Sequence, residues 1–180
     1  MLFERNEFEG LCIINPTIFK DDRGYFYETH NKDIFQKNGI NAEFVQDNQS
    51  FSKKNVLRGL HFQKNPHSQG KLVRVIHGSV LDVVVDIRKS SETFGKHFKI
   101  KLSSENNTML YIPEGFAHGF LALEDNTIFS YKCTNFYNKE SECSILWNDM
   151  SLSIDWGIEN PILTDKDRQA SSFTDSFKNF

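Results

Sequence analysis

The fold is decided by the stretch Leu72-Val73-Arg74-Val75-Ile76-His77-Gly78-Ser79-Val80-Leu81-Asp82-Val83-Val84-Val85-Asp86-Ile87. It is rich in Val and Ile, which favour strands because branched side chains pack well on a pleated surface. Residues 77–79, His-Gly-Ser, interrupt the run, and Gly and Ser are residues that favour turns. The stretch therefore predicts two strands around a tight turn, the second with Asp82, Val84 and Asp86 on one face and Val83, Val85 and Ile87 on the other.

The alternation continues outside this stretch. Phe98, Ile100 and Leu102 share one face of residues 98–102 and two lysines occupy the other, as in a strand buried on one side. Further short strands are predicted at 11–14, 25–29, 109–112, 120–123, 128–133 and 144–147. Many short strands with little helix predict an all-β fold, either a sandwich, a jelly roll or a barrel.

One short, peripheral helix is predicted at residues 31–39, with Asn31 as its N-cap and Asn38-Gly39 as its stop. Neither a repeat nor a Pro-rich or Gly-rich linker divides the chain, so we expect residues 1–180 to form a single domain. Residues 170–180 are polar with scattered Phe, and we expect them to be loosely ordered or docked on a partner subunit.

Charge and cysteine content exclude several classes of protein. The 180 residues include 21 Lys and Arg against 24 Asp and Glu, a net charge of −3, whereas a general nucleic-acid binder needs a basic face. Three cysteines without C-x-x-C spacing indicate a reducing compartment. The first residues lack a signal peptide's basic start, and no window approaches the ~20 apolar residues that span a bilayer. We therefore expect a cytoplasmic protein that binds neither nucleic acid nor membrane.

Residues 46–50 and 56–63 interleave amides, Arg58 and His61 with strand-forming residues. Inward polar side chains of a barrel line a ligand cavity. Arg58 and His61 point to opposite faces of a regular strand, so a shared pocket requires a bulge, and Gly59 is where one could form. The alternative is that His61 is a hydrogen-bonded interior histidine and Arg58 a surface cation.

A second polar segment is Pro113-Glu114-Gly115-Phe116-Ala117-His118. Its P-x-G-x-x-H spacing resembles the second motif of cupin barrels, in which that His is often a metal ligand. A metal cupin also needs two His one residue apart, and here that slot reads His61-Phe62-Gln63, so a metal site is disfavoured. His118 is therefore either a ligand contact or a buried, hydrogen-bonded histidine.

Several ordered blocks cover nearly the whole chain. They include Asp22-Arg23-Gly24-Tyr25-Phe26-Tyr27-Glu28, Gln46-Asp47-Asn48, Leu57-Arg58-Gly59-Leu60-His61-Phe62-Gln63, Gly70-Lys71-Leu72-Val73-Arg74 and Asp165-Lys166-Asp167. In content and order they resemble the dTDP-4-dehydrorhamnose 3,5-epimerases, cupin-type enzymes of deoxysugar nucleotide biosynthesis. The resemblance implies a jelly-roll barrel, a homodimer, a dTDP-4-keto-6-deoxy sugar as substrate, and neither a metal nor an organic cofactor.

The same resemblance implies roles for individual residues. His61 would be the base, Asp167 would orient it, Tyr131 would be the opposing acid, and Lys71 would stabilise the enolate oxygen. The residues implied in substrate binding are Arg23, Glu28, Gln46, Asn48, Arg58, His118, Tyr137, Glu142 and Lys166. Without the resemblance, Glu142 is equally a solvated loop charge and Tyr137 a strand aromatic.

The leading hypothesis is therefore cofactor-free epimerisation at C3 and C5 of dTDP-4-dehydro-6-deoxy-D-glucose, in the biosynthesis of dTDP-L-rhamnose. The first alternative is an epimerase that acts at one carbon only, or on another nucleotide keto-sugar. A metal-dependent cupin oxygenase is opposed by Gln63, and a sugar-binding module without activity is opposed by the joint presence of His61, Lys71, Tyr131 and Asp167.

Overall fold

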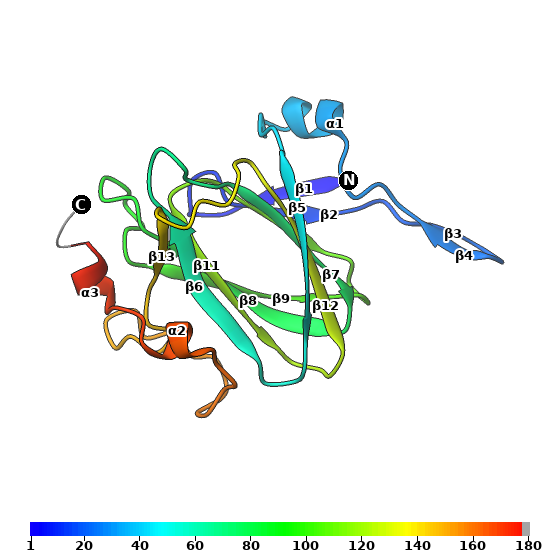
Figure 1. Ribbon diagram of the computed structural model, residues 1–180. Coiled ribbons are helices and arrows are strands. Elements are labelled where there is room, and N and C mark those ends of the chain that lie inside the picture. The colour runs from blue at the N-terminus through cyan, green and yellow to red at the C-terminus, as the bar shows by residue number, and fades with distance from the viewer. Residues whose placement is uncertain (178–180) are drawn as a thin grey trace.

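The computed structural model describes residues 1–177 and contains two antiparallel sheets packed face to face (Figure 1). The six-stranded sheet has the order β1 (Leu2–Arg5), β2 (Cys12–Asn15), β10 (Met109–Ile112), β7 (Lys71–His77), β12 (Thr127–Cys133) and β5 (Gln46–Ser52). The five-stranded sheet has the order β13 (Glu142–Ser144), β6 (Leu57–Gln63), β11 (Phe116–Ala122), β8 (Ser79–Asp86) and β9 (His97–Ser103). The predicted all-β class is confirmed.

The stretch 72–87 forms two strands, β7 and β8, as predicted, but they belong to opposite sheets. The chain crosses from one sheet to the other at Gly78, whose φ of +80° is open to glycine and strained for other residues. A Cβ at this position would lie 2.5 Å from Thr127 Oγ1. The turn therefore forms a corner of the sandwich rather than the end of a hairpin.

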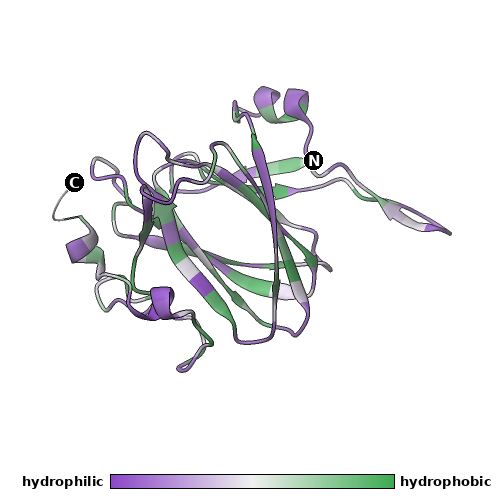
Figure 2. Ribbon diagram, viewed as in Figure 1, coloured by the Kyte–Doolittle hydropathy of each residue, from purple (hydrophilic) through white to green (hydrophobic). Residues whose placement is uncertain are grey.

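Three hydrophobic clusters follow from this arrangement. The inner cluster lies between the sheets and includes Val73, Val84, Leu102 and Phe129. A second cluster covers the outer face of the five-stranded sheet with C-terminal residues, and a third covers part of the outer face of the six-stranded sheet with residues around α1 (Lys32–Lys37). Apolar segments accordingly run along the strands of both sheets in Figure 2. Phe98, Ile100 and Leu102 pack on the inner cluster, so their predicted common face is confirmed.

The predicted helix at 31–39 is confirmed as α1, whose N-cap Asn31 accepts a hydrogen bond from the Ile34 amide. The expectation of a single helix is wrong, because α2 (Asp165–Arg168) and α3 (Phe173–Ser176) are also present. Each is a single turn capped by a hydroxyl residue, which is too short for a helical pattern. Phe173 and Phe177 pack on the chain's own five-stranded sheet, so the tail up to residue 177 is not left loose; residues 178–180 lie outside the described part.

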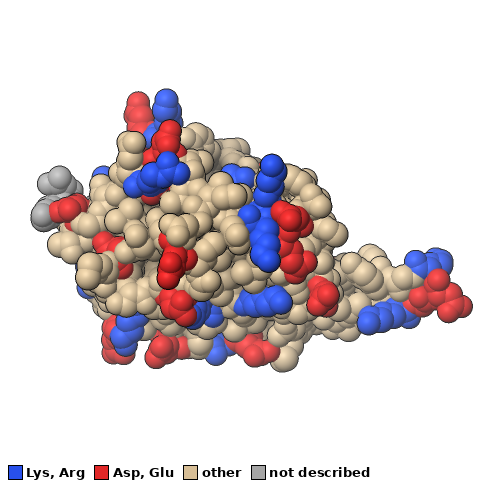
Figure 3. Space-filling model, turned by 90° about the horizontal axis from the view of Figure 1, so that it is seen from below, with Lys and Arg blue, Asp and Glu red and all other residues tan. Residues whose placement is uncertain are grey.

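A hairpin of β3 (Phe19–Asp21) and β4 (Gly24–Phe26) projects from the body (Figure 1). Phe19, Tyr25 and Phe26 are exposed on it. On the face drawn in Figure 3, acidic and basic side chains are interspersed, and both signs meet at the tip of the projection. Every helix within residues 1–177 is too short or too polar to cross a bilayer.

A buried carboxylate network closes the end of β8. Asp86 is fully buried and accepts hydrogen bonds from Arg88 Nη2, Ser91 Oγ and Thr93 Oγ1, each at 2.6 Å. Burial alone would raise the pKa of Asp86, but these hydrogen bonds outweigh burial and lower the pKa from 3.8 to about 2. The carboxylate therefore stabilises the fold in its ionised form.

We expect Asp86→Asn to reduce the free energy of unfolding by about 2 kcal/mol at pH 7. Because the pKa is depressed in the folded state, this contribution is present above pH 4 and is lost as the pH falls from about 4 to about 2. Urea unfolding of both proteins across this range measures the difference. A gap that stays constant down to pH 2 would contradict the assignment.

Candidate active site

A cavity of about 310 Å³ opens between the two sheets. It is lined by Ser50, Arg58, His61, Lys71, His118, Phe120, Phe129, Tyr131, Thr164, Lys166 and Asp167. Seven of these residues were expected in the site from the sequence. The structure therefore brings together residues that lie more than 100 positions apart in the chain.

Strand β6 reaches this cavity through a bulge. Its pairing with β11 matches His61 with His118 and Arg58 with Phe120, so three steps along β6 oppose two along β11. The extra residue restores Arg58 and His61 to the same face, which confirms the predicted bulge. Gly59 has φ of +131°, and a Cβ there would lie 2.5 Å from Gly119 Cα, so the bulge needs glycine.

His61 and Asp167 form a carboxylate–imidazole pair, with His61 Nε2 2.5 Å from Asp167 Oδ1. The His61 side chain is 31% exposed and Asp167 only 3%. Asp167 lies in α2, and Thr164 at the N-cap both donates its hydroxyl to Asp167 Oδ2 at 2.9 Å and accepts from the Asp167 amide at 3.2 Å. The capping turn therefore fixes the carboxylate that holds the imidazole.

Burial alone would raise the pKa of the Asp167 carboxyl. The hydrogen bonds from His61 and Thr164 and the charge of Lys166 act in the opposite direction and leave this pKa below its ordinary value. Asp167 is therefore an anion at neutral pH, and an anion favours a positive charge on the neighbouring ring.

Lys71 and Tyr131 face this pair from the opposite, six-stranded sheet. Lys71 Nζ lies 6.0 Å from the centre of the Tyr131 ring. Burial lowers the pKa of Lys71, while Cys133, Asp82 and Glu142 partly offset this effect. Burial raises the pKa of Tyr131, so its hydroxyl keeps its proton at neutral pH.

A second hollow of about 190 Å³ continues the cavity, since Lys71 and Tyr131 line both. Its expected members are Gln46, Asn48, Tyr137 and Glu142. Gln46 Nε2 donates to Asn48 Oδ1 at 3.0 Å, and Gln46 Oε1 accepts from the Tyr137 amide at 3.0 Å. Strand β5 and the loop before β13 are thereby joined around this hollow.

Glu142 links the two hollows. It accepts a hydrogen bond from the Tyr137 hydroxyl at 2.9 Å and forms an ion pair with Lys166. Burial alone would raise the pKa of Glu142, but these two partners bring it below its ordinary value. Glu142 is therefore not a solvated loop charge, which was one interpretation of the sequence.

Two expected site residues lie elsewhere. Arg23 sits at the turn of the projecting hairpin, where its side chain is 90% exposed and pairs with Asp21 at 2.6 Å. Glu28 is exposed and accepts a hydrogen bond from Asn31 at 2.9 Å. Within residues 1–177, neither lines the two hollows.

The structure adds residues that the sequence did not single out for the site, namely Ser50, Asp82 and Thr164. The Ser50 hydroxyl is buried without a hydrogen-bond partner among the described residues, and Ser50 lines the cavity. Asp82 pairs with His118, with 2.9 Å between His118 Nε2 and Asp82 Oδ2. An aspartate within a run of valines is a signal that could have found Asp82, because a buried charge needs a partner.

The rings of Phe120 and Phe129 form the apolar floor of the cavity. Phe120 belongs to the five-stranded sheet and Phe129 to the six-stranded sheet. Their centres are 4.2 Å apart and the planes meet at 23°. The polar groups of the site therefore lie over a dry, packed contact between the sheets.

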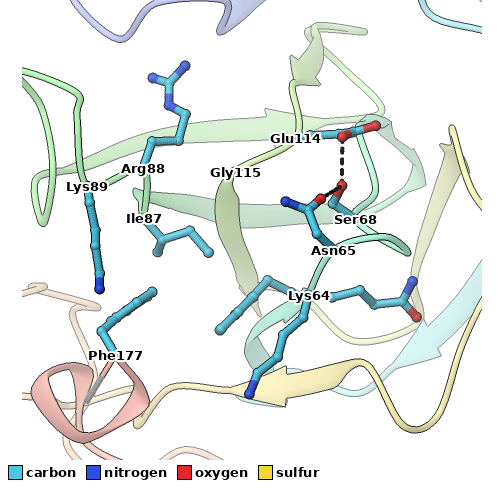
Figure 4. Close-up of a pocket in the computed structure, with 11 residues that line it drawn as sticks. Lys64, Asn65, Ser68, Ile87, Arg88, Lys89, Glu114, Gly115 and Phe177 are labelled. Carbon is cyan, nitrogen blue, oxygen red and sulfur yellow. Dashed lines mark hydrogen bonds between the residues drawn. The ribbon is translucent and has the colours of Figure 1, made fainter. Parts of the chain in front are cut away.

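A larger hollow of about 460 Å³ lies near the C-terminal turn (Figure 4). Its lining includes Ile87 and Phe177, and its Ser68 hydroxyl donates to Glu114 at 2.6 Å and lies 2.9 Å from Asn65 Oδ1. None of the residues expected in the site is among its described lining residues. The smaller cavity therefore remains the candidate, because it gathers a base, an acid and cations.

Gln63 occupies the position where a metal cupin has its second histidine. Its amide nitrogen donates to the His67 and Phe136 carbonyls at 2.6 and 3.2 Å, and its oxygen accepts from the Asn138 amide at 2.7 Å. Within residues 1–177, no three His, Cys, Asp or Glu side chains gather as metal ligands. Gln63 therefore acts in holding the loop beside the second hollow.

Comparison with known proteins agrees with this site. The family model described as dTDP-4-dehydrorhamnose 3,5-epimerase matches residues 5–175. The dTDP-4-dehydrorhamnose 3,5-epimerase of Shigella flexneri is 51% identical over 173 residues, which cover 96% of each chain. Such a match over the whole length shows the family.

Solved structures give the same result. The enzyme of that name from Elizabethkingia anophelis NUHP1 superposes with a TM-score of 0.93 at 51% identity, covering 100% of this chain and 99% of that one. A dTDP-6-deoxy-D-glucose-3,5-epimerase from Legionella pneumophila Philadelphia 1, in complex with dTDP-4-keto-L-rhamnose, superposes with a TM-score of 0.91 at 46% identity. The superposition covers 95% of this chain and 92% of that one. The chain therefore belongs to the dTDP-4-dehydrorhamnose 3,5-epimerase family, with its cupin-like jelly roll.

Proposed function

We propose that this chain is a dTDP-4-dehydrorhamnose 3,5-epimerase, which inverts C3 and C5 of dTDP-4-dehydro-6-deoxy-D-glucose to give dTDP-4-dehydro-L-rhamnose in dTDP-L-rhamnose biosynthesis. The observation that carries this proposal is the placement of His61 with Asp167 on one side of the cavity and of Tyr131 with Lys71 on the other. Family membership supports the same reaction. We assign it to residues 1–180 as one domain, in the cytoplasm, since all three cysteines are unpaired.

The chemistry needs no cofactor because the C4 ketone already acidifies the C–H bonds at C3 and C5. His61 takes the proton, and the C–H electron pair moves into an enolate whose oxygen was the C4 carbonyl. Asp167 holds one ring nitrogen and stabilises the imidazolium, which leaves the other nitrogen for the substrate. A proton returned from the opposite face completes each inversion.

The opposing sheet supplies the remaining groups. Tyr131 keeps its proton in the buried site and is the acid that protonates the enolate from the far side. Lys71 places a positive charge beside the C4 oxygen, where negative charge develops. Because the base and the acid come from different sheets, the sugar ring is held between them, with the base at one face and the acid at the other.

The rest of the cavity binds the nucleotide diphosphate. Arg58 and Lys166 line the cavity and bring cations suited to the diphosphate. His118 contacts the sugar. In the second hollow, Gln46, Asn48 and Glu142 offer polar contacts and Tyr137 a stacking surface for thymine.

Arg23 and Glu28 are proposed to act across a homodimer. Both lie on or beside the projecting hairpin and line neither hollow of their own subunit, and the hairpin exposes Phe19, Tyr25 and Phe26. Exposed aromatic side chains of this kind are typical of protein interfaces. A second copy of the chain would receive the hairpin, and Arg23 would then serve the partner's site.

Incubation with the 4-keto substrate in heavy water tests the reaction. We expect deuterium at both C3 and C5, read by NMR and mass spectrometry. Label at one carbon alone would select the single-carbon epimerase, and binding without label would select the sugar-binding module. An oxidised product whose formation depends on added metal would select the cupin oxygenase.

Tyr131→Phe is expected to suppress net inversion more than proton removal. The variant loses the hydroxyl on the far side but keeps His61, so the proton removed on one face is returned to the same face. Deuterium wash-in at C3 and C5 measures proton removal, and the yield of inverted product measures inversion. Equal loss of both would contradict the role of Tyr131 as the acid.

A further inference from the structure

Asp82 is a buried charge within the barrel that the reaction described above does not use. It lies on β8 with its side chain on the inner face, between Val80 and Val84, and is 0% exposed. His118 Nε2 is 2.9 Å from Asp82 Oδ2. The other carboxylate oxygen, Oδ1, is buried and has no hydrogen-bond partner among the described residues.

Such a group is costly for the fold. A buried carboxylate with one oxygen unpaired loses hydration that a single hydrogen bond does not restore. An apolar residue of similar volume at such a position is often neutral or stabilising. Packing therefore does not explain an aspartate at position 82, whereas its contact with a residue of the cavity does.

The first neighbour of Asp82 is His118, which lines that cavity. His118 is opposite His61 in the β6–β11 ladder, so the two imidazoles stand side by side on the same face. Each ring is held by its own carboxylate, Asp167 for His61 and Asp82 for His118. The second pair therefore repeats the first, and it fixes which His118 ring nitrogen faces the substrate.

The second group that Asp82 affects is Lys71, which lines the same cavity as His118 but belongs to the opposite sheet. Burial lowers the pKa of Lys71, and Asp82 opposes this effect together with Cys133 and Glu142. The ionisable groups that surround the cavity are Asp82 on β8, Arg58 and His61 on β6, His118 on β11, Tyr131 and Cys133 on β12, Glu142 on β13, and Lys166 and Asp167 on α2. Glu142 already has two partners, which leaves Asp82 as the carboxylate with an unused oxygen.

We propose that Asp82 is a positioning residue for the epimerisation, which holds His118 toward the sugar and places a buried carboxylate across the cavity from the ammonium group of Lys71. The substrate named here rests on the proposed function. The two actions of Asp82 are separable, because one depends on its hydrogen bond and the other on its charge.

Two variants separate these actions. Asp82→Asn keeps an acceptor for His118 but removes the charge, so the alkaline limb of kcat/KM should move down by about one pH unit with KM nearly unchanged. Asp82→Leu removes both, so it should show the same shift and also raise KM about fivefold through the loss of the His118 hydrogen bond. The leucine variant is expected to fold, since it replaces a buried carboxylate that has one oxygen without a partner with an apolar group of similar volume.

Asp86→Asn is the matched control. Asp86 is an equally buried aspartate on the same strand, but its partners are Arg88, Ser91 and Thr93. This variant should lose stability without any shift of the pH profile. If both Asp82 variants leave the alkaline limb and KM where the wild type has them, or if they lose only stability as Asp86→Asn does, the proposal is overturned.

A measurement without turnover keeps this test independent of the proposed function. The rate at which an amine reagent modifies Lys71, followed across pH by mass spectrometry of the digested protein, reports the Lys71 pKa. We expect that pKa to fall in Asp82→Asn and Asp82→Leu and to stay unchanged in Asp86→Asn. An unchanged Lys71 pKa refutes the role of Asp82, whereas a failure of the wild type to exchange deuterium at C3 and C5 refutes the epimerase instead.

Discussion

The His61→Asn variant is expected to lose hydrogen exchange at both C3 and C5 of the substrate. In the proposed mechanism a single base, the His61 imidazole held by Asp167 at 2.5 Å, serves both carbons, so removing the imidazole should stop both proton transfers rather than one. General-base catalysis contributes about 10²- to 10⁴-fold, and we expect kcat to fall by at least that range. Deuterium wash-in from heavy water, read separately at each carbon, measures the loss.

His77→Asn is the matched control for this variant. His77 is exposed at the end of β7 and does not line the cavity, so the same substitution there should leave exchange unchanged. Binding of dTDP to His61→Asn, measured by calorimetry, should stay close to that of the wild type, because the nucleotide contacts are elsewhere. Exchange that persists at either carbon would show that a second base acts there.

The second large effect is expected from Lys71→Met, which keeps the length of the side chain and removes its charge. The enolate oxygen at C4 would then form without its cation. Removal of one such oxyanion donor costs about 10²- to 10³-fold in kcat. Steady-state kinetics with the 4-keto substrate should therefore show a loss in kcat larger than any rise in KM.

Lys101→Met provides the comparison for this loss. Lys101 lies on the outward face of β9, where it is exposed, and its replacement should leave kcat as it is. The Lys71 variant should also lose exchange at C3 and C5 to the same extent, since both enolates share the C4 oxygen. A variant impaired at one carbon only would contradict this shared role.

The sequence predicted strands well where one pattern dominates. Residues 72–87 form two strands, and residues 98–102 and 109–112 form one each, all with bounds within two residues of the prediction. Strand β5, in contrast, is Gln-Asp-Asn-Gln-Ser-Phe-Ser and has almost no apolar pattern. It is a strand because β12 pairs with it along its whole length, which is a contact far away in the chain.

Sheet membership could not be predicted from the local pattern. The valine-rich stretch forms strands on both sides of Gly78, but a turn signal does not say whether the chain folds back or crosses to another sheet. At the crossing Gly78 packs closely against Thr127, which is again a contact between distant segments. The local sequence pattern therefore predicts which residues form strands better than it predicts which strands pair with one another.

The site could be predicted in part from local physics. Arg58 and His61 are three residues apart, so they can share a pocket only if the strand bulges between them. Gly59 was the residue able to form that bulge. The position of Asp167 beside His61 came from the family resemblance, because 106 residues separate the two. Arg23 and Glu28 show the remaining limit, since the family resemblance placed them in the site and neither lines the two hollows of this chain.

The stacked rings of Phe120 and Phe129 have a consequence for catalysis. One ring belongs to the sheet that carries His61 and the other to the sheet that carries Tyr131, so their 4.2 Å contact joins the two sheets beneath the proposed base and acid. A close-packed interior transmits small changes in volume rather than absorbing them. If His61 and Tyr131 act as proposed, we therefore expect the size of these two rings to affect the reaction rate, although neither ring takes part in the chemistry.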